Sequence, residues 1–226
     1  MRERFLTLVR RFRHTTYALG EASNALTLIF VAVMARMLDT GTFGVAISVM
    51  ATGSILAEMA EFGFPVLLNR SVAQNPARAW SDTRSALKGQ LLLLPVFLAA
   101  VYGYLLFART APHLMLPAFI LGSSMFLRSL KAALRGACRG QKMFGLEATF
   151  LWTERLSILV VGSGLLMAGW DLWAAAISFF IVRLVDFTAF LIMVRKVTKA
   201  SGSERGGLRA STALPFLIGT LMWSLY

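Results

Sequence analysis

Two long stretches of this chain contain no charged residue, one between Lys88 and Arg109 and the next between Arg109 and Arg128. Each is close to the roughly 20 apolar residues that an α-helix needs to cross a bilayer. Apolar residues make up 57% of the whole chain and its mean hydropathy is +0.68, which is too apolar for a soluble domain of this size. The sequence therefore predicts an all-α, polytopic membrane helix bundle.

The apolar runs divide the chain into four parts. We expect residues 1–15 to form a basic amphipathic segment, because Phe5, Leu8, Val9 and Phe12 recur at helical spacing among arginines. A six-helix transmembrane lobe follows over 16–194 and a basic cytoplasmic linker over 195–209. Residues 210–226 are expected to begin a truncated seventh helix. The six predicted spans lie near 16–35, 43–67, 89–108, 112–134, 147–168 and 172–194.

The positive charges are distributed unevenly between the connecting segments. Segments 1–15, 69–88, 131–146 and 195–209, which six crossings would place on one side, carry 18 of the 23 Lys and Arg residues. Cytoplasmic loops are enriched in Lys and Arg, so we predict a multi-pass protein with a cytoplasmic N-terminus. The same asymmetry accounts for the net charge of +12, and we expect no nucleic-acid partner.

Charged and polar residues inside the predicted spans are the candidate functional residues. Charge is costly in a bilayer and usually faces a cavity or a partner. The main candidates for a substrate path are Arg155, Arg183, Glu21, Asn24, Glu154 and Asp186. The weaker candidates are Arg36, Glu58, Glu61, Arg128, Arg135 and Arg139.

For several candidates a structural explanation remains open. Arg183 and Asp186 are three residues apart on a helix, so they could mainly neutralise each other. Glu58 and Glu61 could simply reach the inner interface, and Arg36 could extend its charge to the outer one.

A basic row in the fourth span and the loop after it has the spacing of one helix face. It either attracts an anionic substrate or anchors the protein to anionic lipid head groups. A second stripe, of small residues in the second span, favours close helix packing inside the lobe. The basic row is Arg128, Lys131, Arg135, Arg139 and Lys142, and the small stripe is Gly44, Ser48 and Thr52.

Catalysis is not expected. The two histidines, His14 and His113, fall on opposite sides of the membrane in this topology, so one chain cannot build a histidine dyad or a His-based metal site. There is no glycine-rich phosphate loop. We expect no enzyme activity, no cofactor and no metal.

Three stretches resemble a known family. They are MARMLDTGTFGVAISVM at 34–50, EFGFPVLLNRSVAQ at 61–74 and LRGACRGQKMFGLEAT at 134–149. They resemble helix ends of the polysaccharide flippases in the multidrug/oligosaccharidyl-lipid/polysaccharide exporter superfamily. The six predicted helices and the basic linker resemble the N-terminal lobe of those two-lobe exporters.

The resemblance implies a function. It implies alternating-access flipping of a lipid-linked oligosaccharide or polysaccharide repeat unit across the bacterial inner membrane, as in lipopolysaccharide or exopolysaccharide synthesis. The implied partners are the bilayer, a lipid-linked saccharide, a second lobe or a second copy of the chain, and polysaccharide assembly proteins. Arg155 and Arg183 are then the first choices to bind a pyrophosphate, since a guanidinium matches phosphate oxygens. On this view Arg183→Ala abolishes transport and leaves the protein folded.

Two alternatives stay open. The first is a proton- or sodium-coupled multidrug antiporter, in which Glu21, Glu58 or Asp186 would bind the ion. The second is a membrane scaffold that transports nothing.

Overall fold

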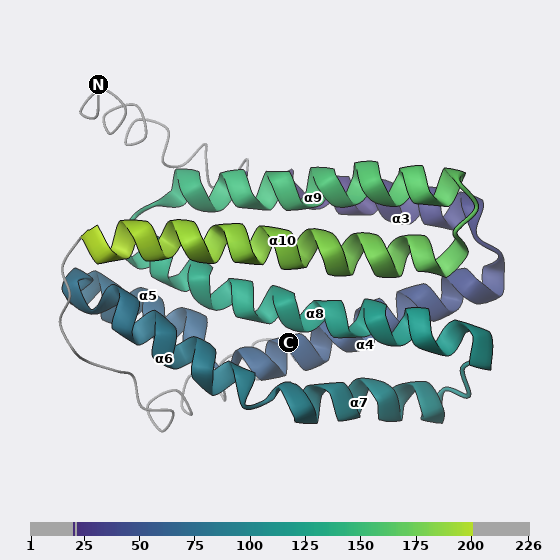
Figure 1. Ribbon diagram of the computed structural model, residues 1–226, viewed down its shortest axis with the longest axis horizontal. Coiled ribbons are helices and arrows are strands. Elements are labelled where there is room, and N and C mark those ends of the chain that lie inside the picture. Colours follow the sequence, from purple (N-terminus) through teal and green to yellow (C-terminus); the bar gives the residue numbers. More distant parts are fainter. Residues whose placement is uncertain (1–19, 21, 201–226) are drawn as a thin grey trace.

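The computed structural model describes residues 20 and 22–200, and the described residues form helices with no strand among them. The helices run roughly side by side along the longest axis of the molecule (Figure 1). This confirms the predicted all-α bundle. The helices are α3 (Asn24–Met37), α4 (Thr40–Glu61), α5 (Phe64–Gln74), α6 (Ala79–Leu91), α7 (Leu94–Phe107), α8 (Pro112–Gly140), α9 (Phe144–Met167) and α10 (Asp171–Ala200), with the short 3-10 helix η1 (Pro76–Arg78) before α6.

Five helical segments are long and apolar enough to cross a membrane, judged by length and composition. Helix α3 is a shorter apolar helix within the first predicted span, 16–35, most of whose remaining residues lie outside the described part. The amphipathic segment 1–15 and the seventh helix at 210–226 also lie outside the described residues. The five segments are Thr40–Gln74, Pro76–Phe107, Pro112–Gly140, Phe144–Met167 and Asp171–Thr198.

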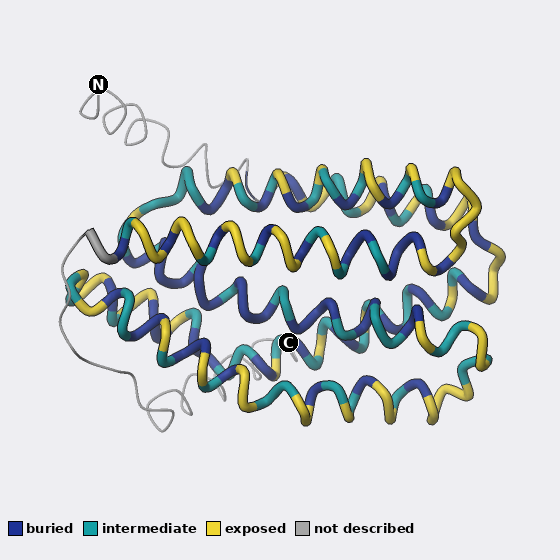
Figure 2. Tube along the Cα trace, in the orientation of Figure 1, coloured by how far each residue is buried: buried dark blue, intermediate teal, exposed yellow. Residues whose placement is uncertain are grey.

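Helix α10 lies between α8 and α9 and contacts both extensively (Figure 1). Helix α3 packs mainly on α9, whereas α4 and α5 pack mainly on α8, and α7 lies beside α8 and α4. Helices α3 and α4 have little contact with each other. Helix α8 is the most buried of the long helices and appears dark blue over much of its length (Figure 2).

The second predicted span, 43–67, lies within the apolar segment Thr40–Gln74, but the helix breaks near the end of the predicted span. Helix α4 stops at Glu61, because Phe62 and Gly63 both adopt left-handed backbone conformations with φ of 50° and 71°. The chain then restarts as α5, with Pro65 in the first turn, where its missing N–H costs no hydrogen bond. At the other end, the Asp39 carboxylate accepts a hydrogen bond from the Thr42 backbone N–H at 2.9 Å and caps α4. Hydrogen bonds from the Thr42 side chain and backbone lower the pKa of this carboxyl.

The third predicted span, 89–108, also differs from the structure. The helix begins ten residues earlier, as α6, and breaks at Leu92 and Leu93 before α7 starts. Pro95 lies in the first turn of α7. A proline disfavours helical geometry in the residue before it and cannot donate its own backbone hydrogen bond, so a break at this point follows.

Close helix packing uses other glycines than the predicted stripe. Gly44 is exposed, and a methyl group added there would meet nothing within 4 Å. A methyl group on Gly53 would instead lie 2.9 Å from the Met125 Cγ atom, where α4 crosses α8. Gly136 and Gly140 of α8 lie against the backbone of α5, and an added methyl group on either would collide with a carbonyl oxygen, that of Pro65 or of Asn69.

The two ends of the bundle differ in charge. One end holds the α5–α6 and α8–α9 connections and the end of α10, and we call it the basic end (Figure 1). The opposite end has exposed charges of both signs, namely Arg36, Asp39, Arg109 and Asp171. Among residues 20 and 22–200, the exposed charged residues at and near the basic end are all cations: Arg70, Arg78, Arg84, Lys88, Lys142, Arg195 and Lys196.

Candidate functional site

Four charged side chains meet in the interior of the bundle, at the junction of α8, α9 and α10. Lys131 of α8 donates from Nζ to Glu154 Oε2 of α9 at 2.6 Å and also to the Asp186 carboxylate of α10. The same ammonium donates to the Phe150 carbonyl oxygen at 3.0 Å. One lysine therefore joins three helices.

Arg183 of α10 completes this buried cluster. Its Nε donates to Glu154 Oε1 at 3.3 Å, and one terminal nitrogen donates to Ser124 Oγ at 3.1 Å. The guanidinium also lies over the Phe179 ring, 4.6 Å from its centre. Two cations face two carboxylates, so the cluster is electrically balanced.

The buried cluster lies near the middle of α9 and α10, and its four side chains are only 4–8% exposed. A single unpaired charge at such a place would be very costly. Each charge here has an opposite partner, and most of the remaining hydrogen-bonding atoms have polar neighbours. The arrangement can hold three apolar helices in one register, because sliding one of them would separate charges.

The alternative that Arg183 and Asp186 mainly neutralise each other is not what the structure shows. Although they are three residues apart on α10, Arg183 pairs with Glu154 and Asp186 pairs with Lys131. Both partners come from other helices, so the pairs connect helices instead of closing within one.

Two further polar contacts lie at the surface beside the buried cluster. Arg155 of α9 donates to the Thr27 hydroxyl of α3. Arg128 of α8 pairs with Glu58 of α4 at 3.4 Å, with side chains 33% and 43% exposed. We call Arg155 with Thr27 and Arg128 with Glu58 the half-exposed pairs. Arg183 contacts Glu154, which precedes Arg155 on α9, and Ser124, which lies one turn before Arg128 on α8, so the three arginines lie near one another.

The other predicted candidates are not members of these two groups, although Asn24 lies one turn before Thr27 on α3 and Glu61 lies one turn after Glu58 on α4. Asn24 is exposed in the first turn of α3, and Arg36 is exposed in its last turn. Glu61 is the last residue of α4 and is half-buried. Glu21 lies outside the described residues.

The first four residues of the predicted basic row lie along one side of α8, but that side packs against neighbouring helices and is not an open basic face. Arg128 reaches α4, Lys131 is buried, and Lys142 lies beyond the end of α8. Arg135 and Arg139 both bind Glu147 of α9, each with a nitrogen 2.7 Å from Oε1. Glu147 therefore ties the start of α9 to the end of α8. The row was expected to extend into the cytoplasm, but α8 stays packed to Gly140 and its arginines reach the neighbouring helices.

Sequence reasoning missed Lys131 and Glu147. Lys131 was assigned to a cytoplasmic loop because it is the first of four basic residues over 131–146. Two features indicate that Lys131 is buried in the bundle. The residues around it are apolar or small, and the helix continues to Gly140. In addition, Glu154 and Asp186 carry two negative charges, and Arg183 alone can neutralise only one of them. Glu147 is the nearest carboxylate along the chain to Arg135 and Arg139.

Within residues 20 and 22–200, no group of three or more His, Cys, Asp or Glu side chains lies close enough to hold a metal ion. The polar interior of the described bundle is instead made of ion pairs between lysine, arginine and carboxylates.

Comparison with known proteins gives a family. The family model described as "Polysaccharide biosynthesis protein" matches residues 16–226. No match was found among curated proteins or among solved structures. The matched region contains all the long apolar helices described above and the three stretches with family-like helix ends. The chain belongs to the polysaccharide biosynthesis protein family.

Proposed function

We propose that this protein is one lobe of a transporter that flips a lipid-linked oligosaccharide or polysaccharide repeat unit across the bacterial inner membrane. It would work by alternating access, together with a second lobe or a second copy of the chain, and in contact with polysaccharide assembly proteins. The family supports a role in polysaccharide synthesis, and the apolar helices support a place in a membrane. Transport of this kind needs no catalytic residues, and we propose that the chain is not an enzyme.

The orientation follows from the charges. Cytoplasmic segments of membrane proteins are enriched in Lys and Arg. We therefore propose that the basic end faces the cytoplasm, and we also propose a cytoplasmic N-terminus from the distribution of Lys and Arg along the sequence. The mixed charges of the opposite end, at Arg36, Asp39, Arg109 and Asp171, fit the outer surface.

The observation that carries the transport proposal is the half-exposed pairs. Arg155 and Arg128 lie within apolar helices, close to the buried Arg183, and both remain partly exposed. Arginine at such depth usually faces a substrate path or a partner protein. A lipid-linked saccharide carries a phosphate or pyrophosphate, which a guanidinium binds well. We propose that Arg155 and Arg128 contact this phosphate or pyrophosphate. Arg183 does not contact it, and instead stabilises the neighbouring helices as part of the buried cluster.

The experiment is transport of a lipid-linked oligosaccharide in vesicles, comparing Arg155→Gln with Arg109→Gln. Arg109 is an exposed arginine at the opposite end, so its replacement controls for the loss of one positive charge. We expect Arg155→Gln to lower the rate about tenfold, because a charge-assisted hydrogen bond contributes roughly 1.5–3 kcal/mol. Unchanged transport by both Arg155→Gln and Arg128→Gln would remove the half-exposed pairs from the substrate path.

A multidrug or cation antiporter fits the arrangement less well. Such an antiporter needs a carboxylate that can exchange its ion, whereas Asp186 already pairs with Lys131 and Glu58 with Arg128; Glu21 lies outside the described residues. The same vesicles can test this alternative. Efflux of a small aromatic cation without saccharide transport would favour the antiporter, and neither activity in the presence of a second lobe would favour a scaffold.

A further inference from the structure

The surface between α6 and α10 at the basic end combines features that no part of the proposed transport path uses. Trp80, Arg84 and Lys88 lie four residues apart on α6, so they share one face of the helix. From α10, Arg195 lies with its guanidinium 5.8 Å from the centre of the Trp80 ring. At this distance a cation and an indole attract each other. Trp80 is half-buried, and the three cations are exposed.

Within the described part of the chain, the acidic residues near this surface do not neutralise it. Asp82 lies on the inner side of α6, is buried, and accepts a hydrogen bond from the Ser71 hydroxyl at 2.5 Å. Glu147 is also buried and is already bound by Arg135 and Arg139. The positive charge of Arg84, Lys88 and Arg195 is therefore left to attract an external anion.

An apolar surface continues directly from the basic face. Leu91 follows Lys88 by three residues on the same side of α6, and Leu92 and Val96 extend the surface onto α7. All three are exposed large apolar side chains. The surface thus presents cations, then an indole ring, then aliphatic side chains. A ligand with an anionic head group and an apolar tail matches this order.

We propose that the surface formed by Trp80, Arg84, Lys88 and Arg195 binds an anionic phospholipid of the cytoplasmic leaflet. The phosphate lies between the three cations, the indole lies at head-group depth, and an acyl chain runs along Leu92 and Val96. Tryptophan is common at this depth, and basic pockets between helices on the cytoplasmic side bind phosphorylated head groups. This site does not depend on the proposed transport, so either can fail without the other.

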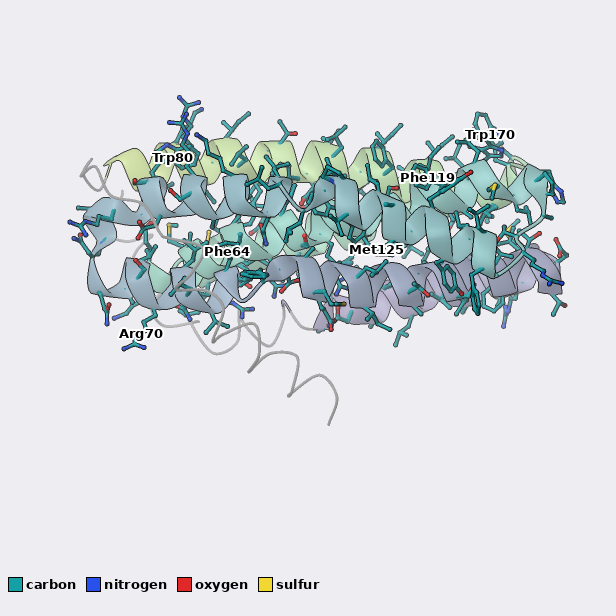
Figure 3. All side chains as sticks on the ribbon, turned by 90° about the horizontal axis from the view of Figure 1, so that it is seen from below. Phe64, Arg70, Trp80, Phe119, Met125 and Trp170 are labelled. Carbon is teal, nitrogen blue, oxygen red and sulfur yellow. The ribbon has the colours of Figure 1, made fainter. Side chains whose placement is uncertain are left out.

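Native mass spectrometry of the detergent-extracted full chain tests the proposal. The protein is mixed with equal amounts of phosphatidylglycerol and phosphatidylcholine that carry the same acyl chains. The matched variants are Arg84→Gln and Arg70→Gln, because both residues are exposed arginines of the basic end. Figure 3 shows Arg70 on the opposite edge of the bundle from Trp80.

We expect the wild-type chain to retain phosphatidylglycerol in preference to phosphatidylcholine. Arg84→Gln should weaken this binding about fivefold, the factor that corresponds to one cation near an anionic surface. Lys88→Gln and Arg195→Gln should each have a similar effect, and Arg70→Gln should have none. An equal loss in all four variants would mean that the whole basic end attracts anions without a defined site. No preference between the two lipids would overturn the proposal outright.

Discussion

The buried cluster and the half-exposed pairs contain the same kinds of side chain at similar depth, yet they differ in what they leave available. In the buried cluster, Lys131 and Arg183 are matched by Glu154 and Asp186, and all four side chains are almost fully buried. In the half-exposed pairs, Arg128 and Arg155 keep part of their surface open. Charged residues inside membrane helices therefore do not all have one role, and exposure separates those that can meet a ligand from those that hold helices together.

The largest effect should come from Lys131→Met. This change leaves Glu154 with Arg183 alone and Asp186 with no cation of the cluster, and losing one partner of a buried ion pair costs roughly 3–5 kcal/mol. We expect a strongly lowered unfolding temperature in detergent and little recoverable protein. Lys142→Met, at an exposed position just beyond α8, is the control and should behave like the wild type.

Adding Asp186→Asn to Lys131→Met sharpens the test. The double variant keeps only the Glu154 and Arg183 pair, so charge balance returns, and most of the lost stability should return with it. If the double variant is as unstable as Lys131→Met, the damage comes from lost packing and not from an unpaired charge.

Arg183→Ala should come next, with a loss of about 2–3 kcal/mol. The variant removes the hydrogen bonds to Glu154 and Ser124, but Glu154 still keeps Lys131. This differs from the expectation that Arg183→Ala would affect transport alone. Thermal unfolding of Arg183→Ala beside Arg155→Ala makes the comparison directly, and equal stability of the two would contradict the structural role of Arg183.

Glu147→Gln should have a smaller effect. Glu147 is buried, but the two arginines that bind it are about one-third exposed, so water can replace part of what is lost. We expect a loss of about 1–2 kcal/mol in the stability of the α8–α9 connection. In Glu147→Gln, this loss would appear as faster hydrogen exchange at the start of α9, with exchange in α10 unchanged. Uniform protection along α9 would mean that Glu147 does not stabilise the α8–α9 connection.

The smallest effect belongs to Glu58 and Arg128. A double-mutant cycle with Glu58→Gln and Arg128→Gln should give a coupling of about 0.2–1 kcal/mol, as for other partly exposed ion pairs. A coupling as large as that of the buried cluster would break the distinction between the two regions. Transport measured on the same variants separates a role in substrate contact from a role in stability.

The sequence predicts the bundle well because charge-free runs leave few alternatives. The stretches on either side of Arg109 became α7 and α8, and the charged residues Glu154, Arg155, Arg183 and Asp186 could be placed inside helices from the sequence alone. Their partners could not. Lys131 looks like a loop residue until α10 is packed against α8, since its partners are 23 and 55 positions away in the sequence.

Helix breaks were also hard to place from the sequence. Phe62 has a left-handed backbone conformation, which residues other than glycine rarely adopt. The hydropathy of the sequence does not predict it. The pairing of α3 with α9 brings Thr27 to Arg155 across most of the chain, and only the tertiary packing of two apolar surfaces can specify it. The local sequence pattern therefore predicts where helices form. Which polar residues contact each other depends on packing between segments that are distant in the sequence.

Gly136 and Gly140 suggest where this protein will tolerate the fewest changes. Each touches α5 through its backbone, and one added carbon would strike a carbonyl oxygen of that helix. In a scan of all single substitutions, we therefore expect Gly136 and Gly140 to tolerate the fewest replacements. The arginines of the half-exposed pairs would accept many replacements before the protein stopped reaching the membrane. On α8, selection for a folded lobe would then act on Gly136 and Gly140, and selection for activity would act on Arg128.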